Sequence, residues 1–175
     1  MATALLANAG DKARFTGDNE LVRPAKYREW VFLSSGLGMT YGPHAPAPGT
    51  PQRFDNVFVN PSSYREFLKT GKWADGTVML LEIRESESKG SINQHGHYQT
   101  GLAALEAHVK DSRRFPEGGW AFYDLKTNAA SKPLPANNRC AQCHVANGAV
   151  DTTFVQFYPE LVPVAKAFGT WKSRD

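Results

Sequence analysis

Five consecutive residues near the C-terminal end of the chain combine two thiols with an imidazole: Cys140, Ala141, Gln142, Cys143 and His144. C-x-x-C-H is the sequence to which a c-type haem is attached. The two thiols can add to the two vinyl groups of a porphyrin as thioethers, and their spacing lets one turn of chain reach both. His144 follows directly, so its imidazole can ligate the iron. The motif therefore predicts one covalently bound haem c per chain.

The same five residues could instead form a local redox disulfide or half of a zinc site, or they could occur together by coincidence. Cys140 and Cys143 are the only cysteines among 175 residues. The other histidines show no ligand pair at the spacing that a zinc site needs. A redox C-x-x-C is expected near a β-α-β pattern, which this sequence does not show. Haem attachment is the role that the spacing of the three side chains favours.

The composition is that of an ordinary folded domain, with 41% hydrophobic and 21% charged residues. A net charge of +3 with no basic run or aromatic-basic stripe gives no reason to expect a nucleic-acid partner. No apolar run is long enough to span a membrane. Residues 1–20 are predicted to be a tail or signal remnant, since Ala7-x-Ala9 resembles a cleavage site. Residues 21–175 are predicted to form a single haem-binding domain. Attachment of haem c needs reduced thiols and export, so we expect a periplasmic location.

Runs of β-branched, aromatic and alternating residues predict a series of strands. They lie at 54–59, 77–83, 98–111 and 120–125, with another beginning at Val31. Residues 34–52 and 85–96 are predicted as loops. Glu82, Glu85 and Glu87 are predicted to form a solvated strand end.

Helices are predicted at the start, middle and end of the chain. Asn60 and Pro61 are suited to the cap and first position of a helix that Gly71 ends. Residues 25–30 have helical composition, and Asp151 could cap a last helix. Strands that follow one another in sequence tend to pair. The fold class is therefore α+β, an antiparallel sheet packed with a few helices, with the haem near the C-terminal motif.

Eight short segments resemble one known family, the cytochrome P-460 and cytochrome c-prime-beta superfamily, over about Tyr27 to Tyr158. They are Tyr27-Arg-Glu-Trp-Val31, Val57-Phe-Val-Asn-Pro61, Lys69-Thr-Gly71, Asp75-Gly-Thr-Val78, Val109-Lys-Asp111, Trp120-Ala-Phe122, Cys140–His144 and Phe157-Tyr-Pro159. The resemblance implies an antiparallel sheet with helices, haem c at the C-terminal motif, and a periplasmic homodimer.

Two departures from the family bear on function. Members that oxidise hydroxylamine carry a lysine that links covalently to the porphyrin, and by register from Asp75 that lysine corresponds to Leu81. Leucine has no nucleophilic nitrogen, so we expect no cross-link and no hydroxylamine oxidation. The same members carry a distal arginine where Asp55 stands. The register of Glu106 with the family's acidic distal residue stays open, because the loop lengths differ.

What occupies the sixth iron position decides between two functions. Phe54, Phe58 and Leu81 are candidates for an apolar pocket that leaves the position open to NO or CO. Met39, in a glycine-flanked loop, is a candidate thioether ligand, and Met79 shares a strand face with Leu81. The leading expectation is a small gaseous or nitrogen-oxide ligand at a hydrophobic distal site. The alternative is a His/Met-ligated electron carrier with a redox partner protein, with weak peroxidase-like activity a third option.

Overall fold

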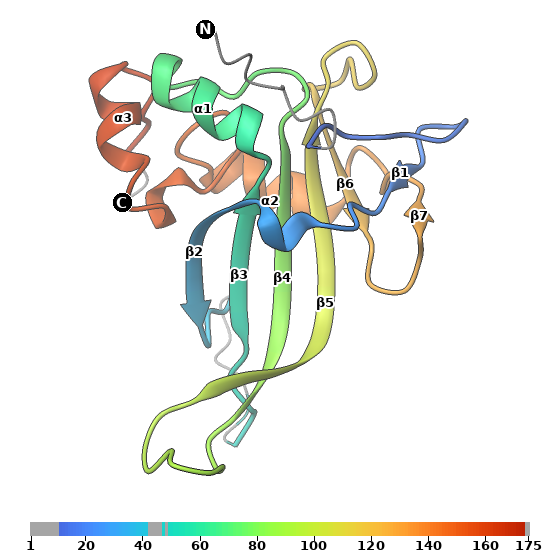
Figure 1. Ribbon diagram of the computed structural model, residues 1–175. Coiled ribbons are helices and arrows are strands. Elements are labelled where there is room, and N and C mark those ends of the chain that lie inside the picture. The colour runs from blue at the N-terminus through green and yellow to red at the C-terminus, as the bar shows by residue number, and fades with distance from the viewer. Residues whose placement is uncertain (1–10, 42–46, 48, 174–175) are drawn as a thin grey trace, which may run out of the picture.

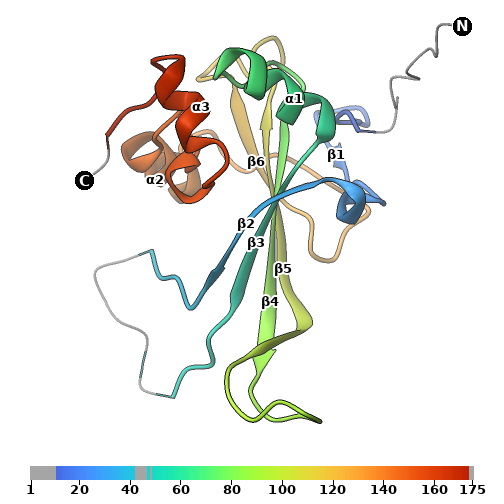
Figure 2. The ribbon, with the colours of Figure 1, turned by 60° about the vertical axis from the view of Figure 1, so that its left-hand side comes forward.

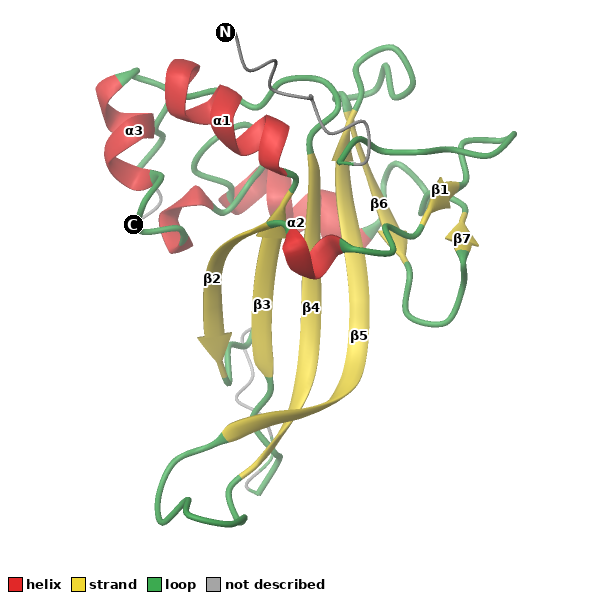
Figure 3. Ribbon diagram, in the orientation of Figure 1, coloured by secondary structure: helices red, strands yellow, loops and turns green. Residues whose placement is uncertain are grey.

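The main feature of the computed structural model, which describes residues 11–41, 47 and 49–173, is a five-stranded antiparallel sheet (Figure 1). Every strand pairs with its neighbour in sequence, in the order β2-β3-β4-β5-β6. The strands are β2 (Val31–Leu37), β3 (Phe54–Val59), β4 (Val78–Glu87), β5 (Tyr98–Lys110) and β6 (Trp120–Asp124). With helices packed on it, the sheet confirms the predicted α+β class (Figure 3). The Ala7-x-Ala9 segment lies outside the described residues.

Both faces of the sheet are covered (Figure 2). One face, called the cavity face here, is covered by α2 (Arg139–Asn147), η2 (Val155–Phe157) and α3 (Val162–Ala167). The outer face is covered by η1 (Tyr27–Glu29) and by β1 (Leu21–Val22), which pairs with β7 (Ala130–Ser131). Because side chains alternate along a strand, β4 places Met79 and Leu81 on the cavity face and Leu80 and Glu82 on the outer face. An apolar run with both faces covered is what the sequence of β4 predicts.

Two clusters of buried side chains correspond to these two faces. On the outer face Tyr27, Phe58, Leu80, Leu105 and Tyr123 pack together. The cluster on the cavity face, next to α1 (Pro61–Thr70) and α3, contains Leu33, Val59, Phe67, Trp73, Met79, Tyr158 and Leu161. Burial of so many large side chains is the main source of stability for a domain of this size.

Helix α1 (Pro61–Thr70) has the predicted bounds. Asn60 precedes it, and Gly71 ends it with a left-handed φ of 65°. The side chain of Asn60 does not cap the helix. Its Oδ1 instead accepts a hydrogen bond from the backbone N–H of Val78 at 2.8 Å, which ties the helix to β4. Among the described helices, none is long and apolar enough to cross a membrane.

Four predicted boundaries are wrong. Strand β2 continues through the predicted loop to Leu37 because it pairs with β3 up to Phe54. Strand β4 likewise extends to Glu87, paired with Tyr98. Residues 25–30 form only the short 3-10 turn η1. No helix begins at Asp151, whose φ of 45° is left-handed; the chain there makes a tight turn before η2.

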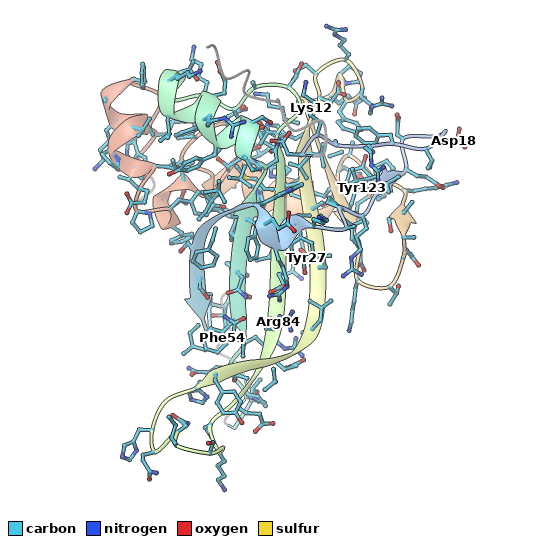
Figure 4. All side chains as sticks on the ribbon, in the orientation of Figure 1. Lys12, Asp18, Tyr27, Phe54, Arg84 and Tyr123 are labelled. Atoms are coloured by element: carbon cyan, nitrogen blue, oxygen red, sulfur yellow. The ribbon has the colours of Figure 1, made fainter. Side chains whose placement is uncertain are left out.

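The prediction that Glu82 is solvated is also wrong. Its side chain is only 1% exposed and lies on the outer face. The carboxylate accepts hydrogen bonds from the Tyr27 hydroxyl at 2.5 Å, from Arg28 Nη2 at 2.7 Å and from Arg84 Nε at 3.0 Å. Figure 4 shows Tyr27 and Arg84 on the same side of the sheet. Burial alone would raise the pKa of Glu82, but hydrogen bonds from Arg84, Tyr27 and Asn56 outweigh it and lower the pKa to about 2.

Candidate functional site

A cavity of about 320 Å³ lies between the cavity face of the sheet and the C-terminal segment of the chain. This volume is in the range of small-molecule and cofactor sites. Most of its lining is apolar. Side chains from all five strands and from α2 and η2 contribute, among them Val57, Met79, Leu81, Phe122, Phe154, Phe157 and Tyr158. All three members of the C-x-x-C-H motif, Cys140, Cys143 and His144, line the same cavity.

Helix α2 presents the motif to the cavity. Asn138 caps the helix, its side chain accepting a hydrogen bond from the backbone N–H of Ala141 at 3.0 Å. Residues three and four apart lie on one side of a helix, so Cys140, Cys143 and His144 point the same way. Both cysteines are free thiols, half-buried in the cavity wall. The sequence prediction that one turn of chain carries both thiols and the imidazole matches this helix.

His144 is oriented by a backbone carbonyl. Its Nδ1 lies 2.8 Å from the carbonyl oxygen of Thr152, to which only an N–H can donate. This bond places the ring proton on Nδ1 and leaves the Nε2 lone pair for a metal. Phe122 and Phe154 pack against the ring at centroid distances of 4.9 and 4.2 Å. Burial lowers the pKa of His144, which favours the neutral imidazole that ligation requires.

The carbonyl of Thr152 is held in place by a strained turn. Asp151 and Thr152 have φ values of 45° and 62°, a conformation that β-branched residues rarely adopt. Two contacts anchor the turn: Lys110 pairs with Asp151, and the indole N–H of Trp73 donates to Thr153 Oγ1 at 2.9 Å. The surrounding structure therefore forces the backbone into the position that orients His144.

Gly148 makes this close packing feasible, so Gly148→Ala is expected to disturb it. A Cβ there would lie 2.6 Å from the carbonyl carbon of Thr152. The variant should lose about 1–3 kcal/mol of unfolding free energy, since the backbone of the turn must move. Urea denaturation measures this loss. Gly101→Ala, on β5 with no atom within 4 Å of the added methyl, is the control and should change stability by less than about 0.5 kcal/mol. Equal stability of the two variants would show that the turn is not tightly packed.

Strand alternation divides the predicted pocket residues between the two faces. Leu81, Met79 and Asp55 all line the cavity. Phe58 does not, since it packs in the outer cluster against Tyr27. Phe54 lies on the same side of β3 as Phe58, because the two are four positions apart along the strand. The prediction that these two phenylalanines form the pocket is therefore wrong.

Met39 follows β2 directly and lines the same cavity as His144. Its thioether packs on the backbone of Gly36, where a Cβ would overlap the sulfur. His144 contacts the other end of the sheet, through His108 on β5 and Phe122 on β6. Met79 pairs with His108 in the sheet and so lies nearer to the His144 side.

Two carboxyl groups interrupt the apolar wall. Asp55 is 6% exposed and accepts a hydrogen bond from the Tyr41 hydroxyl at 3.0 Å. Burial raises the pKa of Asp55, although Tyr41 and Arg53 oppose the rise. Burial also raises the pKa of Glu106, and the charges of Asp124 and Asp55 add to that rise. The cavity lining is thus less uniformly hydrophobic than the apolar pocket that the sequence predicts.

Tyr41 and His108 are among the lining residues that sequence reasoning does not assign to the site, and Glu106 is named there only as an open correspondence with the family's acidic distal residue. The alternation of β5 does place Glu106 and His108 on one face, but the sequence does not say that the face borders a cavity. His108 is buried, and neither of its ring nitrogens has a hydrogen-bond partner among the described residues. Its ring stacks on Phe122 at 4.0 Å, so it lies next to the proposed iron ligand as a packed, neutral side chain.

A comparison with family models relates this site to known proteins. The model for cytochrome P460 matches residues 24–155, which include the five strands and the C-x-x-C-H motif. The chain belongs to the cytochrome P460 family. A search of the curated proteins finds no significant match. Membership of the cytochrome P460 family suggests a haem c cytochrome and agrees with the resemblance seen in the sequence.

The residues of the cavity fit the haem c that the cytochrome P460 family implies. Two free thiols lie three residues apart on one helix face, and the adjacent imidazole has its Nδ1 committed to Thr152. The opposite wall is largely hydrocarbon, which suits a porphyrin. Leu81 also lines the cavity. Cys140, Cys143 and His144 are therefore the residues that would hold the haem.

Proposed function

We propose that this protein is a mono-haem c-type cytochrome that binds small ligands such as NO or CO at a hydrophobic distal site. Cys140 and Cys143 would form the thioethers, and His144 would supply the axial nitrogen. The observation that carries the proposal is the cavity itself, which is lined by both thiols, by an oriented imidazole and by the apolar side chains of Val57 and Leu81. When bound, the haem supplies an iron whose sixth position can take a diatomic ligand.

The side chains of the protein orient the His144 ring and line the cavity in which a ligand would bind. Phe122 and Phe154 hold the His144 ring by packing on it, and Thr152 fixes its tautomer. Val57 and Leu81 line the opposite wall, where they would exclude water and limit the size of the ligand. Leu81 has no nucleophilic nitrogen and cannot form a covalent cross-link to a porphyrin. We therefore expect no hydroxylamine oxidation.

Electron transfer with Met39 on the iron is the second candidate, favoured by one observation. Met39 lines the same cavity as His144, and Gly36 leaves room for its sulfur. His/Met ligation would raise the reduction potential and suit an electron carrier. A redox partner protein would then be required.

Optical spectra of Met39→Ala distinguish the two functions. For a ligand-binding protein, the reduced wild type is expected to be high-spin, to change its spectrum on adding CO or NO, and to keep these properties in the variant. For an electron carrier, the wild type is low-spin and the variant becomes high-spin. Met79→Leu, which removes the other lining thioether at similar volume, is the control. A low-spin wild type that Met39→Ala converts to high-spin would replace the first function by the second.

We also propose that the protein is periplasmic and forms a homodimer. The C-x-x-C-H motif needs export for haem attachment, which supports a periplasmic location. The family resemblance supports a homodimer. Analytical ultracentrifugation of the purified protein tests for the homodimer, since a single species at monomer mass would exclude a dimer.

A further inference from the structure

The lining of the cavity includes three side chains with oxygen atoms that accept hydrogen bonds, Tyr41, Asp55 and Glu106. Tyr41 donates its hydroxyl proton to Asp55 Oδ2, so the hydroxyl offers only lone pairs to another partner. Glu106 lines the same cavity, and its side chain has no hydrogen-bond partner in the described structure. A ligand entering here meets two carboxyl groups and the Tyr41 hydroxyl, whose proton is committed to Asp55, with the Ser34 hydroxyl further along the lining.

The carboxyl groups of Asp55 and Glu106 lie on either side of Leu81 on the cavity face of the sheet. Leu81 pairs with Val57 on one side and with Glu106 on the other. Asp55 lies two residues before Val57, on the same face of β3. A ligand against Leu81 would therefore lie between Asp55 and Glu106.

The part of the cavity lining that contains Asp55 and Glu106 disfavours a negative charge. Burial raises the pKa of both carboxyl groups, and the charge of Asp55 contributes to the rise at Glu106. An anion placed between them would meet the same lack of solvation and the same repulsion. Arg139 also lines the cavity, but its side chain is exposed, and water and salt screen it.

We infer that Asp55 and Glu106 determine ligand specificity by excluding anions, so that the cavity takes neutral diatomic molecules in preference to azide, cyanide or nitrite. The inference rests on the proposed function and narrows its ligand class. Tyr41 contributes by holding the Asp55 carboxylate against the wall. Neutral diatomics carry no net charge and gain little or nothing from removing either carboxylate.

Optical titrations of the purified haem protein test this inference with two probes. Sodium azide is titrated into the oxidised protein and CO into the reduced protein, at pH 7 and constant ionic strength. The variants are Asp55→Asn, Glu106→Gln and the double variant. Glu87→Gln, an exposed acid at the far end of β4, is the matched control.

Asp55→Asn and Glu106→Gln should each tighten azide binding relative to CO by about tenfold or more. Removing a unit charge within roughly 10 Å at an effective dielectric constant near 20 has an effect of this size. The double variant should show the larger gain, and Glu87→Gln should show none. An unchanged ratio of azide to CO affinity in the double variant would overturn the inference, as would equal gains for both probes, which indicate that the substitutions only enlarge the cavity.

The CO titration of the wild type tests the proposed function separately. If the wild type does not bind CO because Met39 occupies the iron, the proposed function fails. The ratio of azide to CO affinity is then measured in the Met39→Ala background, with and without Asp55→Asn. The same tenfold shift is expected there, so anion exclusion is decided in either case.

Discussion

A protein in which Cys140 and Cys143 are both replaced by serine is expected to carry no covalently bound haem. The thioethers require sulfur, and the chain has no other cysteine to supply it. Both thiols line the cavity from one side of α2, so no other nucleophile is placed equivalently. Intact-protein mass spectrometry of material matured in a host competent for haem attachment measures the result: wild type with the mass of one haem added, the double variant with the mass of the bare chain.

Single variants and a control on the same helix sharpen this test. Cys140→Ser or Cys143→Ser leaves one thioether, so covalent haem should persist at lower yield. His144→Ala keeps both thiols and should retain some attached haem with an altered spectrum, because the axial nitrogen is lost. Val145→Ala, also on α2 but 65% exposed, should match the wild type. Wild type with the mass of the bare chain would remove the basis of the proposed function.

The chemistry of the site is predictable from sequence where it is contiguous. The thiols and imidazole occupy five positions, so their proximity needs no knowledge of the fold. The α1 helix is equally local, because Asn60, Pro61 and Gly71 mark both ends. The shared face of Met79 and Leu81 follows from strand alternation alone.

Contacts between distant segments could not be predicted in the same way. Alternation groups Phe54 with Phe58 and separates both from Asp55, but it does not say which group borders the cavity. The carbonyl of Thr152 is a backbone group placed by a strained turn, and no side-chain pattern indicates it. Glu82 looks solvated in sequence because its partner Tyr27 comes 55 residues earlier.

Replacing Glu82 by glutamine is expected to lower the free energy of unfolding by several kcal/mol. The substitution keeps the shape but leaves Arg28 and Arg84 without the carboxylate that they share. Loss of one partner from a buried ion pair typically costs several kcal/mol. The pKa of Glu82, lowered from 4.5 to about 2, corresponds to about 3 kcal/mol of stability at neutral pH. Urea denaturation of the two proteins at pH 7 measures this difference.

The difference in stability between wild type and Glu82→Gln should decrease as the pH falls. Because folding lowers the pKa of Glu82, its contribution is complete above the unfolded value near 4.5 and is lost as the pH falls towards 2. The stability gap between wild type and Glu82→Gln should therefore be widest at neutral pH and narrow between pH 4.5 and 2. Glu85→Gln is the control: its pair with Arg53 is largely exposed, so the cost should stay below about 1 kcal/mol. A gap of equal size at pH 7 and pH 3 would mean that packing, and not the charge of Glu82, stabilises this face of the sheet.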